Sequence, residues 1–119
     1  MHWVKDVDAR YGPVVGYDVR NRRFDGVSVE MHLPKRQGQS LELVYVGSDL
    51  LKAHLEVARR LVDMKHRGPQ GLRFIRKTSG VHLSDFARKV SVDSERVLAW
   101  ESGELPVDDA IVSAYHSLI

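Results

Sequence analysis

The sequence predicts an α+β fold in which a small antiparallel β-sheet module and a linker helix precede an all-α domain. Three observations support this prediction. Residues 27–33 alternate apolar and polar side chains, residues 48–65 carry an apolar stripe at helical spacing, and residues 81–103 repeat short helical patterns. Alternation with period two is typical of a half-buried strand, and spacing of three and four residues is typical of an amphipathic helix. We therefore expect two parts, residues 1–67 and residues 68–119.

The β-module is predicted from three strand-like segments. The segment "PVVGYDVR" (13–20) is a short first strand, and "NRRFDG" (21–26) is a turn rich in Asn, Asp and Gly. Residues 24–34 and 40–46 are expected to form the central hairpin, joined by the polar loop "PKRQGQ". Three strands are stable only when one face is covered, so the helix that follows is expected to cover them.

The linker helix is expected to start at an N-cap, Ser48, and to continue to about Lys65. Asp49 lies where the helix dipole favours an acid. The apolar stripe of this helix is predicted from its spacing as Leu51, Leu55, Ala58, Leu61 and Val62. Pro69 suits the first turn of the next helix, which is expected to end near Ser79.

Residues 81–103 have the pattern of two short helices joined by a tight turn. Phe86 and Ala87 belong to the apolar face of the first helix, and Val97 and Trp100 to that of the second. Asp93 is a good N-cap for the second helix. The helix is then closed by Gly103, which suits the left-handed position after a helix, and a final helix is expected to open at Asp108 or Asp109. This is the pattern of a helix-turn-helix.

Together with "GLRFIRKTSG" (71–80), this stretch resembles the helix-turn-helix of the Xre/Cro/C1-like repressors. The resemblance implies a lambda-repressor-like domain over residues 68–119. In that family an arginine of the first helix pairs with the glutamate of a "W-E-x-G" signature, which implies a structural ion pair between Arg76 and Glu101. Losing one partner of such a buried pair would leave the other charge unpaired.

The order of the parts, with "LRFIRK" at residues 72–77, is similar to that of the MqsA-type antitoxins. The N-terminal module of that family holds zinc through paired CxxC motifs. This chain has no cysteine, and its six histidines lack metal-ligand spacing, so no metal and no other cofactor is expected.

The resemblance implies a sequence-specific DNA-binding transcriptional regulator, a repressor or antitoxin-like autoregulator. It would insert helix 94–101 into the major groove of operator DNA as a homodimer, with half-sites about 34 Å apart. The candidates for base contacts are Ser94, Glu95, Arg96 and Ala99. The candidates for phosphate contacts are Leu83, Arg88, Lys89, Arg59 and Arg60. The alternative for the charged candidates is a solvated surface position.

The charge distribution favours a second function. Residues 1–68 carry 12 Lys and Arg against 9 Asp and Glu, whereas residues 69–119 carry 6 against 7. DNA readers usually concentrate positive charge on the contact face. The alternative is therefore a protein-interaction module, an antitoxin-like inhibitor or assembly factor with a diverged helix-turn-helix, which binds a toxin-like partner through the N-terminal module.

Other classes find no support in the sequence. No Gly-rich phosphate loop, nucleophile elbow or HExxH motif occurs, so no enzymatic activity is expected. No apolar run has the length of a membrane span, and the start "MHWVKDVDAR" lacks the apolar segment of a signal peptide. A cytoplasmic location is expected. The terminal residues Tyr115, Leu118 and Ile119 are candidates for a dimer surface.

Overall fold

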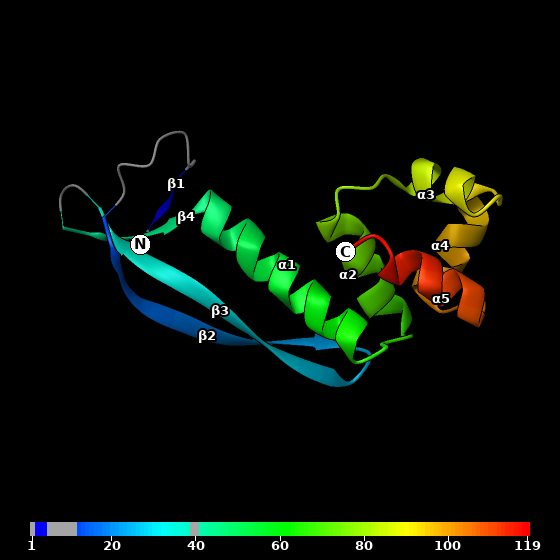
Figure 1. The fold of residues 1–119 in the computed structure, drawn as a ribbon, viewed down its shortest axis with the longest axis horizontal. Coiled ribbons are helices and arrows are strands. Elements are labelled where there is room, and N and C mark those ends of the chain that lie inside the picture. Colours follow the sequence, from blue (N-terminus) through cyan, green and yellow to red (C-terminus); the bar gives the residue numbers. More distant parts are fainter. Residues whose placement is uncertain (1, 5–11, 39–40) are drawn as a thin grey trace.

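The computed structural model describes residues 2–4, 12–38 and 41–119. In these residues the fold is α+β, with a β-sheet followed by five helices. The molecule is elongated, with extents of 51 × 27 × 20 Å. Figure 1 shows the sheet at one end and the shorter helices at the other, with the long helix α1 (Gly47–Asp63) leading from the sheet to the helical end.

The sheet has the strand order β1-β4-β3-β2. Its strands are β1 (His2–Val4), β2 (Val14–Phe24), β3 (Val27–Gln37) and β4 (Leu43–Val46). The pairs β2–β3 and β3–β4 are antiparallel, as predicted, but β1 pairs with β4 in parallel. The sheet is therefore mixed, and the expectation of a purely antiparallel sheet holds for β2 to β4 only.

The main hairpin is β2–β3, and the prediction of a six-residue turn at residues 21–26 was wrong. Asn21 pairs with Glu30, and the strands continue to Phe24 and Val27. The turn consists of Asp25 and Gly26, whose φ angles are 52° and 81°. Two left-handed residues in a two-residue loop form a type I′ turn, for which Asp-Gly is a preferred sequence.

The predicted central hairpin, 24–34 with 40–46, was also misplaced. In the described part of this hairpin, β3 and β4 are paired at Arg36 with Val44 and at Gln37 with Leu43. Most of the predicted loop "PKRQGQ" instead lies in β3, which extends to Gln37. Residue 40, at the start of the predicted partner, lies outside the described residues.

The predicted alternation of β3 is confirmed where α1 (Gly47–Asp63) packs on the strand. Val29, Met31 and Leu33 are buried, whereas Ser28 and Glu30 are exposed. The buried apolar face of α1 is rotated from the predicted stripe and comprises Ala53, Val57, Ala58 and Leu61. The predicted member Leu51 is 53% exposed.

Both ends of α1 differ from the predicted ends. The N-cap position is occupied by Val46 rather than Ser48, because the helix follows β4 directly. The helix ends at Asp63, two residues before the predicted Lys65. Lys65 has a left-handed φ of 56°, which turns the chain out of the helix.

The remaining helices follow their local signals. They are α2 (Pro69–Thr78), α3 (Leu83–Lys89), α4 (Ser94–Ser102) and α5 (Asp109–His116). Pro69 opens α2, Gly103 ends α4 with a φ of 86°, and Asp93 and Asp108 cap α4 and α5 with their side chains. None of the helices in the described ranges is both long enough and apolar enough to span a membrane.

One apolar cluster runs through both predicted parts of the chain. It includes Met31 and Leu61 from the sheet and α1, and Leu72, Phe86 and Trp100 from the later helices. The chain therefore passes residue 68 without a break in the core. This continuity fixes the orientation of the helical end relative to the sheet.

Candidate nucleic-acid interface

The pair α3–α4 is held by apolar residues on the faces that point into the molecule. Phe86 and Val97 are 0% exposed, and Ala87 and Trp100 are 3% and 6% exposed. The backbone N–H of Val92 donates to the Ala87 carbonyl at 2.9 Å and closes the turn between the two helices. Because one face of α4 is locked in this way, the opposite face is presented to solvent.

The ion pair implied by the resemblance is present. Arg76 of α2 donates from Nε to Glu101 Oε2 at 2.7 Å and from Nη2 to Glu101 Oε1 at 2.9 Å. The Tyr115 hydroxyl of α5 donates to the same carboxylate at 2.8 Å. Arg76 also donates to the Val81 carbonyl at 2.9 Å. This network, which we call the Arg76–Glu101–Tyr115 network, fastens α2, α4 and α5 together.

The protonation states of the network follow from its contacts. The hydrogen bond to Glu101 raises the pKa of Arg76, so this guanidinium stays charged. Burial raises the pKa of Tyr115, and the hydrogen bond to Glu101 raises it further, so this phenol stays neutral. Both buried donors therefore remain available to the carboxylate.

The base-contact candidates lie on the outer part of α4. Glu95 and Arg96 are exposed, whereas Ser94 and Ala99 are half-buried. Leu98, on the same helix, is 52% exposed. The Arg96 backbone N–H is used by the Asp93 cap at 2.8 Å, which holds the first turn of α4. The side chains of Glu95 and Arg96 thus extend from a helix whose first turn is fixed.

The phosphate-contact candidates fall into two groups. Arg88 and Lys89 end α3: the Arg88 side chain is 81% exposed and lies 3.7 Å from Asp85, and Lys89 Nζ lies 3.4 Å from Ser117 Oγ. Leu83, at the start of α3, packs against the core, so its side chain supports the helix. These three residues lie on the helix that precedes α4.

Arg59 and Arg60 form the other group, and the structure does not bring them to α4. Both lie on α1, whose main contacts are with β3, β4 and α2. Arg60 donates to the Glu30 carbonyl of β3 at 2.8 Å and so fastens α1 to the strand. Arg59 is exposed.

A cation beside α4 was missed in the sequence. Arg73 of α2 is exposed and lines a hollow together with Leu98 and Ser102 of α4. The helical spacing of α2 predicts only that Arg73 points outward. Arg73 lies next to α4 because α2 and α4 cross, which the sequence does not reveal.

The hairpin turn supplies an unpredicted cap for α2. Asp25 accepts hydrogen bonds from the backbone N–H groups of Gln70 at 3.1 Å and Gly71 at 3.0 Å, while its own N–H donates to Gln70 Oε1 at 2.8 Å. His66 Nε2 lies 2.8 Å from the same carboxylate. Because the N-cap residue Gly68 has no side chain, Asp25 satisfies amides that would otherwise lack a partner.

The contacts of Asp25 also set its protonation. Burial raises the pKa of Asp25, but the hydrogen bonds from His66 and from the Gly71 and Gln70 amides outweigh it, so the pKa lies below its ordinary value. The carboxylate is therefore held in its charged form, which is the form that two amide donors favour.

Further contacts join the sheet and α1 to the last helices. The rings of Phe24 and Phe74 are 4.8 Å apart, and Arg22 lies over both. The linker between α1 and α2 contacts α5 and the residues before it, because His116 Nε2 lies 2.7 Å from the His66 carbonyl and Arg67 forms an ion pair with Asp109. The β2–β3 hairpin and the linker between α1 and α2 are thus fixed to α2 and α5.

No protein-family model, curated protein or solved structure matches the chain. The resemblance to the Xre-type and MqsA-type proteins therefore rests on the sequence motifs and on the ion pair between Arg76 and Glu101. Within the described ranges, no three His, Asp or Glu side chains are grouped as ligands for a metal ion.

Proposed function

We propose that the chain is a sequence-specific DNA-binding transcriptional regulator, a repressor or antitoxin-like autoregulator, that inserts α4 into the major groove. The observation that carries this proposal is the division of α4 into two faces. Val97, Trp100 and Glu101 are buried on one face, and Glu95 and Arg96 are exposed on the other. A helix held in this way, behind a second helix and a tight turn, is the arrangement that helix-turn-helix proteins use for base contacts.

The outer residues of α4 supply a chemically varied reading surface. The Arg96 guanidinium can donate two hydrogen bonds to O6 and N7 of guanine, and the Glu95 carboxylate can accept one from N4 of cytosine. Ser94 can contact a base or a phosphate, and the Ala99 methyl group can contact a thymine methyl. We assign the main discrimination between base pairs to Arg96, because a bidentate hydrogen-bonded contact contributes more to base specificity than the single contacts of the other residues.

Within the described residues, the surroundings of α4 supply only a few candidates for phosphate contacts. Arg88 and Lys89 lie at the end of α3, and Arg73 lies beside α4. Since phosphate neutralisation provides most of the sequence-independent affinity, one copy with three such cations would bind weakly. Two copies on half-sites a whole number of helical turns apart would bind tightly enough for regulation.

The test is a titration of labelled duplex DNA from upstream of the coding sequence, at several salt concentrations. Arg96→Ala should weaken specific binding by about 1–3 kcal/mol and relax the preference at one base pair. Arg88→Ala should weaken binding to all duplexes and lower the salt slope by about 1.

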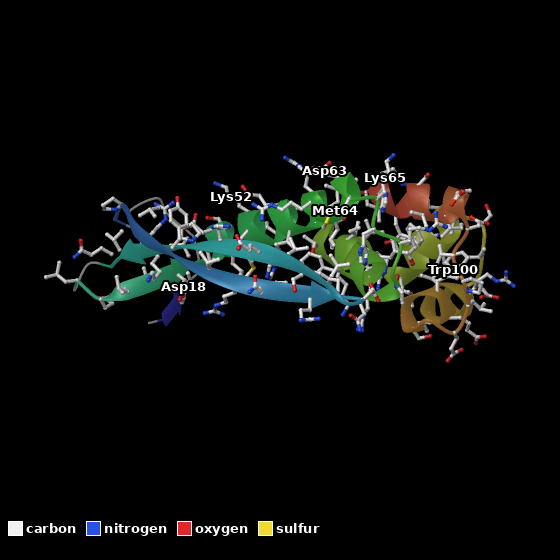
Figure 2. The ribbon with its side chains drawn as sticks, turned by 90° about the horizontal axis from the view of Figure 1, so that it is seen from below. Asp18, Lys52, Asp63, Met64, Lys65 and Trp100 are labelled. Atoms are coloured by element: carbon white, nitrogen blue, oxygen red, sulfur yellow. The ribbon has the colours of Figure 1, made fainter. Side chains whose placement is uncertain are left out.

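The matched control is Lys52→Ala, which removes the same charge from an exposed position on α1. Figure 2 shows Lys52 toward the sheet and Trp100 of α4 at the far end of the molecule. Lys52→Ala should leave the affinity unchanged. Equal weak binding of the wild-type chain to unrelated duplexes would contradict the proposal.

The second candidate is a protein-interaction module, and one observation favours it. Leu98 and Leu105 are 52% and 41% exposed, so apolar surface lies at and just beyond the helix that would face DNA. This candidate predicts that Leu98→Lys abolishes binding of a protein partner. The DNA-binding proposal predicts that the added cation leaves DNA affinity the same or increases it.

A further inference from the structure

The strand β2 forms an open edge of the sheet. It has β3 on one side, and no strand in the described ranges lies on the other. Figure 1 shows β3 between β2 and α1 over the half of the hairpin that is farther from α2. With 11 residues, β2 is as long as any strand of the sheet. Long open edges expose unpaired backbone groups and are usually shielded or paired.

The hairpin geometry determines which residues of β2 direct their backbone groups outward. The type I′ turn makes Phe24 and Val27 a hydrogen-bonded pair, and hydrogen-bonded and non-hydrogen-bonded pairs alternate in an antiparallel ladder. Arg22, Arg20 and Asp18 therefore bond to β3. The N–H and C=O groups of Tyr17, Val19, Asn21 and Arg23 point to the open edge.

The side chains along this edge are more apolar than an unpaired edge requires. Val15, Tyr17 and Val19 are 52%, 57% and 56% exposed. The opposite half of the strand carries cations, since three of the four residues from Arg20 to Arg23 are arginine. The first half, whose one charged residue is Asp18, therefore suits a partner strand that is apolar or presents a cation, and the second half suits a partner strand without cations.

A second copy of β2 meets both requirements. Val19 is the midpoint of Val14–Phe24, and an antiparallel pairing centred on Val19 has a regular ladder from Gly16 to Arg22, ending at the β-bulge between Val14 and Gly16. It places Val19, whose backbone groups point outward, opposite its own copy, as a hydrogen-bonded pair requires. It also places Asp18 opposite Arg20 of the second copy, twice, and sets no arginine directly opposite another.

We propose that the chain forms a homodimer in which β2 pairs antiparallel with β2 of a second copy about a twofold axis at Val19. The two sheets then join into one continuous sheet, and the two helix-turn-helix units lie toward its opposite ends. Backbone hydrogen bonds provide the affinity. The charges select the register, because a pairing centred on Asn21 would set Arg20 against Arg22 of the other copy.

The intrachain contacts of the two charged residues are compatible with this register. Asp18 lies 3.6 Å from Arg20 and 3.5 Å from Lys35 of its own chain, and both ion pairs are partly exposed. Arg20 also lies over the Tyr45 ring at 5.8 Å. The second copy adds a cation beside each Asp18, so charges of opposite sign alternate across the axis.

The first experiment measures the mass of the full chain by sedimentation equilibrium. The wild-type chain should show twice the 13.5 kDa chain mass. Val19→Pro removes the outward N–H at the axis, and proline is tolerated at an edge position of this kind, so the variant should fold and sediment as a monomer. Val19→Thr keeps the N–H and should stay dimeric. A monomeric wild-type chain, or a dimeric and folded V19P variant, would overturn the proposal.

The second experiment tests the register itself. Asp18→Arg and Arg20→Asp each put like charges opposite each other across the axis, so each variant alone should dissociate at least about tenfold more readily. In an equimolar mixture, every introduced arginine faces an aspartate of the other variant, and a mixed dimer should form with near wild-type affinity. If mixing restores nothing, the β2 pairing is wrong and dimerisation uses another surface, such as the C-terminal residues Leu118 and Ile119.

This pairing stands apart from DNA binding. If D18R loses dimerisation but neither the wild-type chain nor any variant binds DNA specifically, the proposed function is contradicted and the β2 pairing is not. If the wild-type dimer binds DNA specifically and the V19P variant is still a dimer, the β2 pairing is contradicted and the proposed function is not.

Discussion

Among the residues that the structure describes, each half of the molecule contains one arginine–carboxylate pair with two hydrogen bonds. In the sheet half, Arg36 of β3 bonds to Asp49 of α1 at 2.6 and 3.2 Å. In the helical half, Arg76 bonds to Glu101 at 2.7 and 2.9 Å. The arginines differ in exposure: the Arg36 side chain is 30% exposed and that of Arg76 is 8% exposed, whereas both carboxylates are buried, Asp49 at 6% and Glu101 at 4%.

This difference shows which interactions set the positions of the helices in each half. Water reaches Arg36, so the pair with Asp49 adds to a contact that the apolar face of α1 already defines. Water is excluded from Glu101, and its carboxylate joins α2, α4 and α5 at one point. The position of α4 therefore depends on a polar network in addition to its apolar face, whereas the position of α1 depends mainly on apolar packing.

The largest expected effect comes from Glu101→Gln, which keeps the shape of the side chain and removes its charge. Arg76 would stay buried and charged without a counterion, so we expect a loss of about 3–5 kcal/mol in the free energy of unfolding. The matched variant Asp49→Asn should cost at most about 2 kcal/mol, because the Arg36 side chain is partly solvated.

Urea denaturation followed by circular dichroism measures both losses. A triple variant, Arg76→Met with Glu101→Leu and Tyr115→Phe, should recover much of the stability, because it leaves none of the three buried side chains with an unpaired polar group. Equal losses in the free energy of unfolding for E101Q and D49N would show that the two ion pairs contribute alike, which contradicts the difference inferred between the two halves.

A smaller effect is expected for Tyr115→Phe, which removes one donor to Glu101 and leaves Arg76 in place. A hydrogen bond to a charged group is worth about 1.5–3 kcal/mol, and we expect a loss in that range at neutral pH. The variant should also change the alkaline limb of the stability profile.

The sign of the pH effect follows from the pKa of Tyr115, which burial and the Glu101 hydrogen bond raise above its ordinary value of 10.0. As pH rises through about 10, the unfolded chain loses this proton before the folded chain does, so the contribution of Tyr115 to stability decreases. Denaturation midpoints between pH 8 and 11 should therefore fall more steeply for the wild-type chain than for Y115F. Parallel profiles would show that the Tyr115 hydroxyl is not part of the network.

The helical half could be predicted closely because its signals are local. Asp93 caps an amide three residues later, and Asp108 does the same at the start of α5. Gly103 ends α4 where its sequence position predicts. The ion pair between Arg76 and Glu101 was predicted from the family resemblance, because nothing in the spacing of 25 residues between them identifies it.

The sheet half could be predicted only in part, because its determinants are distant in the sequence. Residues 20–23 of β2 are polar on both faces, so no alternation distinguishes this edge strand from a turn. Pro34, which usually signals a loop, lies inside β3. Asp25 was assigned to the turn, but its partners Gln70 and Gly71 lie 45 and 46 residues further along the chain.

The smallest of the expected effects tests the junction between the two halves. Asp25→Asn keeps a residue that tolerates the left-handed turn, and it removes the charge that the α2 amides and His66 contact. Since Asp25 acts as a cap for α2, we expect a loss of about 1 kcal/mol at neutral pH. Asp63→Asn, at an exposed position near the end of α1, should cost nothing.

The pH dependence of this loss distinguishes a charged cap from a polar contact. The pKa of Asp25 in the folded chain lies below the ordinary 3.8, so its contribution is complete above that pH and is lost as pH falls through the folded pKa. The difference between the wild-type chain and D25N should therefore be constant from pH 7 to about 5 and shrink toward pH 3. A difference that persists undiminished to pH 3 would mean that the carboxylate charge contributes nothing to the cap of α2.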